Sequence, residues 1–343
     1  MKALVLEEYG RLVYREVPEP EVGPDDVLVR IEACGICGSD IHGLDGSTGR
    51  RIPPIVMGHE AAGVVAATGS KVKGIPEGQR VTFDSTITCG TCFFCRRGEI
   101  NLCDNRRVLG VSCAEYRQPG AFAEYISVPG RILYPLPENV SFDQAAMTEP
   151  LSVAMHAVGR LPPLSDGSAV VVGTGTIGLL LIQCLRASGC RLIVAVDVVR
   201  ERLERARGLG ADRVLDSGAA DVRAEVLRLT EGRGADAAFE AVGIPATFTA
   251  AMSCLRKGGA LSMVGNISAS VDLGLQAAVT REITLYGSCA SSGEYPACLE
   301  MMSRGTVDVG AMISASAPLS EGPVWFKRLS RGEGGLLKVI LKP

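Results

Sequence analysis

The chain has 343 residues, of which 47% are hydrophobic and 21% are charged, and its formal net charge is −3 at pH 7. This balance is typical of a globular protein, and the slight acidity argues against a nucleic-acid-binding surface. The length exceeds the usual size of one domain, so we expect two domains.

The N-terminus, MKALVLEEYG, begins as a short strand-like run and then turns charged. It has neither the apolar core nor the cleavage signature of a signal peptide. No uninterrupted apolar stretch reaches the roughly 18 residues needed to cross a bilayer. We therefore expect a cytoplasmic protein that binds no membrane, in which the 12 cysteines are thiols or metal ligands.

Residues 1–150 have the pattern of a β-rich domain. Short runs of strand-forming residues alternate with turn signals such as PEPEVGPDD and GSKVKGIPEG. The strand candidates are DDVLVRIEA, EAAGVVAATG, QRVTFDST and AFAEYISVP. Short strands in this rhythm predict an all-β domain.

The same region holds residues that could form a catalytic metal site. Cys37 lies in CGICGSD, His59 and Glu60 lie in VMGHEAAG, and Glu149 lies in TEPLSVAMHA. A thiolate, an imidazole and one or two carboxylates can bind Zn²⁺ and leave one position open for water or substrate. Spacing alone does not establish this site, because the residues are far apart in the sequence and a lone buried histidine is more often a core residue.

A second group of cysteines is much more compact. The stretch CGTCFFCRRGEINLC contains Cys89, Cys92, Cys95 and Cys103. Two consecutive CxxC steps cannot pair locally as disulfides without strain. The spacing also differs from the C-x2-C-x2-C-x3-C-P run of a [4Fe–4S] cluster. Four soft ligands suit a closed, structural zinc, so we favour zinc over a disulfide clip or an iron–sulfur cluster.

From residue 151 to residue 287, apolar runs alternate with helical stretches, which predicts a parallel sheet covered by helices. The first of these segments are SAVVVG, IGLLLIQCLRASG, RLIVAVD and RERLERARGLG. After residue 287 the rhythm breaks, and the chain ends in the strand-like run GLLKVILKP. We expect residues 288–343 to complete the first domain. His156, in the apolar run SVAMHAVGR, is interpreted as a core or domain-junction histidine.

A glycine-rich turn opens the α/β half. In VVVGTGTIG, Gly173, Gly175 and Gly178 form GxGxxG between a strand and a helix. Such a turn lets the backbone approach a pyrophosphate, which then meets the helix N-terminus. We therefore expect a dinucleotide-binding domain over 151–287, with Thr176 and Ile177 joining the three glycines as cofactor contacts.

The second strand of this half ends at Asp197, 19 residues after Gly178. A carboxylate at this place hydrogen-bonds the ribose hydroxyls of NAD and repels the 2′-phosphate of NADP. We therefore expect NAD rather than NADP. Arg200 and Arg202 follow and could soften this discrimination; Arg202 is a candidate cofactor contact, and a solvated helix-face charge is its other interpretation.

In combination, these motifs resemble those of the zinc-dependent medium-chain dehydrogenase/reductase family. CGICGSD, GHE, C-x2-C-x2-C-x7-C, EPL and GxGxxG occur in that family's order along nearly the whole chain. The chain looks most similar to the polyol dehydrogenase branch, to which sorbitol and galactitol-1-phosphate dehydrogenases belong. The resemblance implies an α/β fold with a GroES-like catalytic domain over 1–150, completed by 288–343, and a Rossmann domain over 151–287.

The resemblance also implies two zinc ions per chain. It makes Cys37 and His59 ligands of a catalytic zinc, with Glu60 and Glu149 supplying the carboxylate or holding the zinc-bound water. Which of the two glutamates coordinates stays open. The compact cysteine group, Cys89 to Cys103, is assigned to a structural zinc.

Further roles are implied for residues near the substrate and the cofactor. Ser39 would receive the proton of the substrate hydroxyl, and His42 would pass it through the cofactor ribose toward solvent. Val264, Gly265 and Asn266 would contact the nicotinamide edge.

Two positions depart from sorbitol dehydrogenases. Gly43 stands where those enzymes have a tyrosine, and Ala290 stands where they have an arginine. Both departures remove polar groups, and an unpaired buried hydroxyl costs roughly 1–3 kcal/mol. We expect NAD-dependent oxidation of a secondary alcohol on a small polyol-like substrate to a ketone, with sorbitol itself disfavoured. A threonine-type amino alcohol, a butanediol, an aminocyclitol and a simple alcohol are the alternatives.

Two hypotheses lie outside this class of enzyme. A zinc-ribbon binding protein with a passive α/β scaffold is disfavoured by the acidic balance and by the lack of interleaved basic and aromatic residues around the cysteines. A zinc-free reductase of the same superfamily is opposed by the complete ligand sets. On resemblance alone, we expect a homodimer or homotetramer that binds no nucleic acid.

Overall fold

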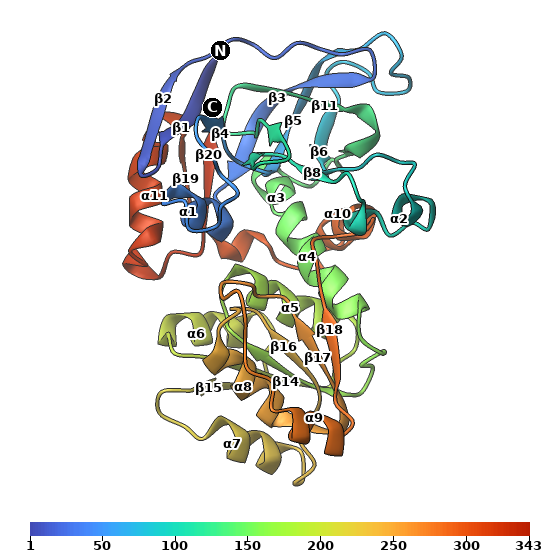
Figure 1. Cartoon of the computed structure of the whole chain (residues 1–343), viewed down its shortest axis with the longest axis vertical. Coiled ribbons are helices and arrows are strands. Elements are labelled where there is room, and N and C mark those ends of the chain that lie inside the picture. Colours follow the sequence, from blue (N-terminus) through green and yellow to red (C-terminus); the bar gives the residue numbers. More distant parts are fainter. The chain divides into compact units, whose positions relative to one another are not determined.

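The computed structural model describes all residues, 1–343, and the chain divides into two compact units. The first unit comprises Met1–Glu149, Tyr295–Gly305 and Val309–Pro343, and the second comprises Pro150–Glu294 and Thr306–Asp308. Both ends of the chain therefore belong to the first unit (Figure 1). No helix is at once long enough and apolar enough to cross a membrane.

The first unit is built on a seven-stranded sheet. Its strands run in the order β12 (Leu133–Pro135), β6 (Arg80–Phe83), β5 (Glu60–Thr68), β3 (Asp26–Gly35), β20 (Lys338–Lys342) and β19 (Ile313–Pro318), with β11 (Tyr125–Pro129) also paired to β3. The final strand β20 pairs antiparallel with β3 and parallel with β19. Along β3 the alternate residues Val27, Val29, Ile31 and Ala33 are buried, because successive side chains of a strand point to opposite faces.

Shorter elements complete the first unit. The small sheets contain β2 (Arg11–Glu16), β1 (Lys2–Glu8) and β4 (Ile55–Val56); β10 (Arg117–Gln118) and β9 (Val111–Ser112); and β7 (Thr86–Ile87) and β8 (Arg107–Val108). The helices are α1 (Gly38–Leu44), α2 (Phe93–Arg96), α3 (Phe142–Ala146), α10 (Tyr295–Ser303) and α11 (Gly322–Ser330). In the core, the rings of Phe122 and Phe326 meet edge to face with their centroids 5.7 Å apart.

The second unit is a six-stranded parallel sheet with helices packed on it. The strand order is β15 (Arg213–Asp216), β14 (Leu192–Asp197), β13 (Ser168–Val172), β16 (Ala235–Glu240), β17 (Leu255–Met263) and β18 (Thr284–Gly287). The helices are α5 (Thr176–Ala187), α6 (Arg200–Gly208), α7 (Val222–Leu229), α8 (Pro245–Cys254) and α9 (Leu275–Thr280), and α4 (Thr148–Gly159) begins at the boundary of the two units.

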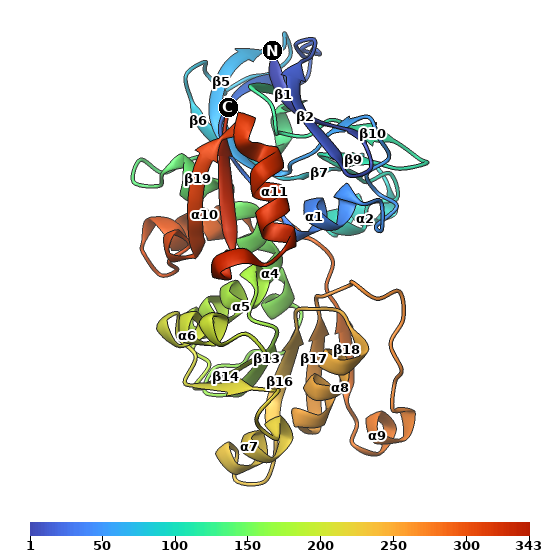
Figure 2. The same ribbon diagram turned by 90° about the vertical axis from the view of Figure 1, so that its left-hand side faces the viewer.

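Helix α5 contacts β13 and β14, and α8 contacts β13, β16 and β17 (Figure 2). Every residue of β13 is buried, as expected for a parallel strand that helices cover. The predicted fold, a β-rich domain followed by a helix-covered parallel sheet, is confirmed. Because all six strands are parallel, the loops that follow β13, β14, β16 and β17 open at the same edge of the sheet.

Candidate functional site

Three predicted ligand residues come together in the first unit. The ligand atoms of Cys37, His59 and Glu60 all lie within 4.8 Å of one another. The sheet brings them together, since Gly35 at the end of β3 pairs with Glu60 at the start of β5. Cys37 follows two residues later as the N-cap of α1. A thiolate, an imidazole and a carboxylate in this arrangement fit the donor preferences of Zn²⁺.

Glu149, the fourth predicted residue of this site, lies outside the 4.8 Å group. It stands in the first turn of α4, and its Oε1 accepts a hydrogen bond from Ser85 Oγ at 3.2 Å. Burial raises the pKa of Glu149 to about 7, with a lowering contribution from His59 and a raising one from Glu60. The carboxyl group is therefore electrostatically coupled to two of the grouped residues.

Asp40 contacts both Cys37 and His59. Its Oδ2 accepts a hydrogen bond from the backbone N–H of Cys37 at 3.2 Å, and its Oδ1 lies 3.5 Å from Nδ1 of His59. Asp40 is fully buried. Burial raises its pKa, but His59 and Arg51 outweigh burial and hold the pKa well below its usual range. Asp40 is thus an ionised residue beside the imidazole, in the place where carboxylates commonly orient metal-binding histidines.

The proposed proton-transfer residues lie on α1. Ser39 and His42 are both exposed and three residues apart in this helix, so they share one face. The Ser39 hydroxyl accepts a hydrogen bond from Arg51 at 3.4 Å, and the backbone carbonyl of His42 accepts one from Ser47 at 2.7 Å.

Sequence reasoning missed Lys338, which forms an ion pair with Glu60 and donates a second hydrogen bond to the carbonyl of Ile36 at 3.1 Å. Burial lowers the pKa of this lysine, but Glu60 and Cys37 outweigh burial and raise it. The lysine is therefore charged. The available signal was a lysine between the apolar pairs Leu336–Leu337 and Val339–Ile340 in the run GLLKVILKP.

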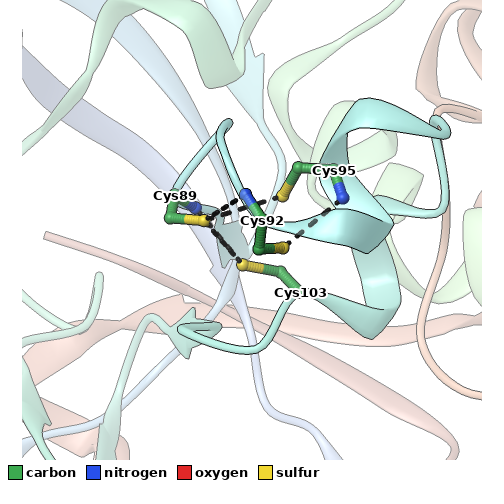
Figure 3. A group of neighbouring side chains, drawn as sticks. All are labelled: Cys89, Cys92, Cys95 and Cys103. Atoms are coloured by element: carbon green, nitrogen blue, oxygen red, sulfur yellow. Dashed lines mark hydrogen bonds between the residues drawn. The ribbon is translucent and has the colours of Figure 1, made fainter.

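The four cysteines of the compact group converge, with their sulfur atoms directed toward a common centre (Figure 3). The Sγ atom of Cys89 lies 4.0 Å from that of Cys95 and 3.6 Å from that of Cys103. These separations exclude a disulfide from Cys89 to either residue, which needs about 2.05 Å, and all four cysteines are free. The separations match four sulfurs at about 2.3 Å from one zinc, which lie roughly 3.8 Å apart.

Backbone amides support the cysteine sulfurs. The N–H groups of Cys92, Cys95 and Cys89 donate to the Sγ atoms of Cys89, Cys92 and Cys103, respectively, at 3.3 to 3.5 Å. Hydrogen bonds from Thr91 and from the Cys92 amide lower the pKa of Cys89 to about 5. The Cys95 and Asp104 amides similarly lower the pKa of Cys92. Burial and the thiols of Cys92 and Cys103 raise the pKa of Cys95 to about 11. The amides therefore favour the thiolate, the form of cysteine that binds metals, at Cys89 and Cys92.

The glycine-rich turn of the second unit follows β13. Gly173 has φ 91°, a conformation that favours glycine. A Cβ at Gly178 would collide with the carbonyl oxygen of Gly173, whereas a Cβ at Gly175 would meet nothing within 4 Å. The open space at Gly175 fits the close approach of a pyrophosphate. Thr176 and Ile177 form the first turn of α5, at the amide-rich end of the helix.

Asp197 ends β14, and its carboxylate is fully engaged by the protein itself. One oxygen accepts hydrogen bonds from the Thr174 N–H at 2.6 Å and the Thr174 hydroxyl at 2.9 Å. The other accepts from the N–H groups of Val198 at 2.8 Å and Val199 at 2.9 Å. A carboxylate has about four acceptor positions, so a ribose hydroxyl would have to replace one of these donors. The Thr174 hydroxyl can rotate away. Arg202, in the first turn of α6, is half-buried and forms no ion pair.

The predicted nicotinamide segment, Val264 to Asn266, follows β17. The N–H groups of Val264 and Gly265 both donate to the backbone carbonyl of Glu240. The Glu240 side chain is buried and accepts hydrogen bonds from the Val242 and Gly243 amides. Glu240 therefore holds the loop that follows β16 and the loop that follows β17 at the same edge of the sheet. Sequence reasoning missed this residue.

His156 pairs with Glu294 in the second unit, with Nδ1 and Oε1 2.7 Å apart. Both side chains are largely buried. Ala290, one of the two departures noted in the sequence, has φ 52°. Gly43, the other, lies buried against Arg51.

Comparisons with known proteins cover both units. Residues 23–138 match the alcohol dehydrogenase GroES-like domain, and residues 176–304 match the zinc-binding dehydrogenase family. A sorbitol dehydrogenase of Bacillus subtilis is 31% identical over 100% of this chain and 97% of its own length. An L-idonate 5-dehydrogenase of Vitis vinifera is 35% identical over 94% of this chain and 89% of its own length. A solved zinc-binding dehydrogenase of Sinorhizobium meliloti, bound to NADP, has a TM-score of 0.91 at 31% identity and covers 100% of this chain and 99% of that one.

Proposed function

The chain belongs to the zinc-binding medium-chain dehydrogenases, and we propose that it transfers a hydride from a secondary alcohol of a polyol-like substrate to NAD, giving a ketone. The observation that carries this proposal is the group of the half-buried Cys37 and the buried His59 and Glu60, whose ligand atoms lie within 4.8 Å of one another. In our proposal these residues hold a catalytic zinc, and Glu149 supports the group or exchanges with Glu60. When bound, zinc supplies a Lewis acid that lowers the pKa of an alcohol, and NAD supplies a hydride acceptor.

The remaining residues of this site orient and move protons. The ionised Asp40 keeps the His59 imidazole in place. Ser39 accepts the proton of the substrate hydroxyl, and His42, on the same face of α1, passes it toward solvent. Proton transfer to a positioned side chain contributes about 10²–10⁴-fold to such reactions.

A structural zinc is proposed for Cys89, Cys92, Cys95 and Cys103. The supporting observations are the convergence of the four sulfurs and the lowered pKa of Cys89. A closed four-thiolate site leaves no position for substrate, so its role is to stabilise the loop.

NAD is the proposed cofactor, with its pyrophosphate on the Gly173–Gly178 turn and its ribose on Asp197. The Asp197 carboxylate supports NAD, because a 2′-phosphate there would bring like charges together. The half-buried, unpaired Arg202 is the residue that would allow some use of NADP, the cofactor bound in the Sinorhizobium meliloti structure.

The polyol class of substrate is supported by the names of two relatives, which act on sorbitol and on L-idonate. The glycine at position 43 and the alanine at position 290 argue against sorbitol itself.

The proposal is tested by measuring NAD reduction with the zinc-loaded protein on a panel of hexitols, pentitols, inositols, aminocyclitols, their phosphates, threonine and butanediol. We expect turnover with at least one polyol-type secondary alcohol, and its loss when zinc is removed. A response to threonine or butanediol alone would replace the polyol substrate with that alternative. Turnover that survives zinc removal would contradict the proposal.

A further inference from the structure

Arg51 is a buried arginine next to the proposed catalytic site. It lies between α1 and β4, and its side chain is 5% exposed. Its Nη2 lies 3.2 Å from Oδ1 of Asp40 and 3.4 Å from Oγ of Ser39, and its Nη1 donates to the carbonyl of Arg50 at 3.1 Å. Its Nε is buried without a partner. The guanidinium of Arg51 thus bridges Asp40 and Ser39. Asp40 contacts the proposed zinc ligands Cys37 and His59, and Ser39 is the proposed proton acceptor.

The contacts of Asp40 give this bridge its importance. Asp40 accepts from the Cys37 N–H and lies against the His59 imidazole. A histidine that binds a metal is neutral, so in the metal-loaded protein Arg51 is the cation that balances the buried Asp40. Loss of the guanidinium would leave the buried Asp40 carboxylate without its cation, held only by the Cys37 amide and the imidazole beside it.

Gly43 explains how Arg51 reaches this place. A Cβ built at Gly43 would collide with Cγ of Arg51 and would lie 3.2 Å from its Cβ and 3.4 Å from its Cδ. The φ of Gly43 is not in the left-handed region, so its backbone does not require glycine. The missing side chain at position 43 is therefore space that the aliphatic stem of Arg51 fills.

The pairing also limits what Arg51 can do. Its guanidinium faces a fully buried carboxylate, so its charge is already neutralised. The geometry therefore favours a role in holding protein groups over a role in binding an anionic substrate.

From these contacts we infer that Arg51 is a positioning residue for the catalytic metal centre, because it holds Asp40 and Ser39 in place together. Gly43 leaves the space that the Arg51 side chain occupies. This inference rests on the proposed function, since it assumes that Cys37 and His59 bind zinc.

The first test measures zinc affinity at the catalytic site by chelator competition, together with kcat, in Arg51→Met. The matched control is Arg50→Met, which removes an exposed positive charge at the preceding position. Substitution of outer partners of metal ligands typically lowers metal affinity by about 10–100-fold. We expect a loss of that size in Arg51→Met and less than about threefold change in the control. Added guanidinium should restore part of the zinc affinity of Arg51→Ala, which a general folding defect would not allow. Unchanged zinc affinity in Arg51→Met would overturn the inference.

The second test is a double-mutant cycle between positions 43 and 51. Gly43→Ala should lower zinc affinity when Arg51 is present and have little effect in Arg51→Ala, because the colliding Cγ is then gone. The control is Gly38→Ala, in the same helix, where an added Cβ meets nothing within 4 Å. Additive effects at 43 and 51 would contradict the link between the two positions.

The zinc measurements separate a failure of the proposed function from a failure of the inference about Arg51. If the wild-type protein binds no zinc beyond the cysteine site, the proposed function fails. If it binds that zinc and Arg51→Met binds it as tightly, only the inference fails.

Discussion

Lys338 in the last strand of the first unit forms an ion pair with Glu60, and the two side chains are 2% and 1% exposed. The pair lies within the proposed catalytic site, because Glu60 belongs to the same ligand group as Cys37 and His59. Lys338 would therefore compete with a zinc ion for the Glu60 carboxylate if the metal binds there as proposed. The pair is also one of the few contacts in which a charge is withdrawn almost completely from water.

Removing the lysine should destabilise the protein. In the metal-free protein, Lys338→Met leaves Glu60 buried without its cation, and breaking a buried pair in this way costs about 3–5 kcal/mol. The check is urea unfolding of the metal-free variant and wild type. Lys2→Met is the matched control, since Lys2 pairs with Glu16 on the surface, and should leave the midpoint almost unchanged. Equal midpoints for Lys338→Met and wild type would show that Glu60 is satisfied in another way.

The compact cysteine group should hold a zinc that supports folding and not turnover itself. We predict that Cys89→Ser loses one zinc equivalent and lowers the melting temperature, while the zinc of the catalytic site stays bound. Metal content and thermal unfolding measure both effects. The control, Cys289→Ser, replaces an exposed cysteine of the second unit and should change neither. A Cys89→Ser protein with full zinc content would argue against the four-thiolate site.

Asp197 should set the preference between the two dinucleotides. We expect Asp197→Ala to weaken NAD binding by about 10-fold or more, because hydrogen bonds to a charged group contribute roughly 1.5–3 kcal/mol. NADP binding should weaken less, since the repulsion of its 2′-phosphate is also removed. Calorimetric titration with both cofactors measures the ratio. Arg202→Ala is the complementary variant and should reduce the affinity for NADP only. An equal loss of affinity for both cofactors in Asp197→Ala would instead indicate that the glycine-rich turn is disturbed.

The Glu294–His156 pair predicts a pH dependence of stability. Burial raises the pKa of Glu294, but hydrogen bonds from His156 and from the Ser292 amide outweigh it and hold the pKa below 4.5. Between the lower folded pKa and 4.5, the unfolded chain binds more protons at this residue, so stability rises with pH. The contribution of Glu294 to folding stability is fully present above pH 4.5 and is lost as the pH falls through the folded pKa.

Glu294→Gln should therefore be less stable than wild type at neutral pH, by about 1 kcal/mol for a pair that keeps some solvent contact. The difference should shrink as the pH falls below 4.5 toward the folded pKa. Thermal unfolding across this range tests the sign, with Glu225→Gln as control, a glutamate whose side chain is 37% exposed and paired with Arg228. A stability difference between wild type and Glu294→Gln that grows toward low pH would contradict this prediction.

The sequence was most informative where function is encoded in short spacing. The cysteine run and the glycine turn can be recognised because their residues are close in the chain, and their chemistry depends on that local loop. The alternation of apolar runs was enough to predict the parallel sheet.

The positioning residues could not be found in that way, because sheet register and packing decide their partners. Lys338 and Glu60 are 278 residues apart, and only the pairing of β20 with β3 and of β3 with β5 brings them together. The sequence did identify Gly43 as a departure from sorbitol dehydrogenases. It could not identify the side chain of Arg51, which packs on that glycine in the fold.

The most direct test of the central claim is turnover and NAD binding in Cys37→Ser and His59→Ala. With the alcohol that responds best in the substrate panel, we predict that both variants lose turnover while calorimetry gives an NAD affinity close to that of wild type, because the glycine turn and Asp197 are untouched. Retained turnover in the metal-depleted double variant would contradict a catalytic zinc at Cys37 and His59.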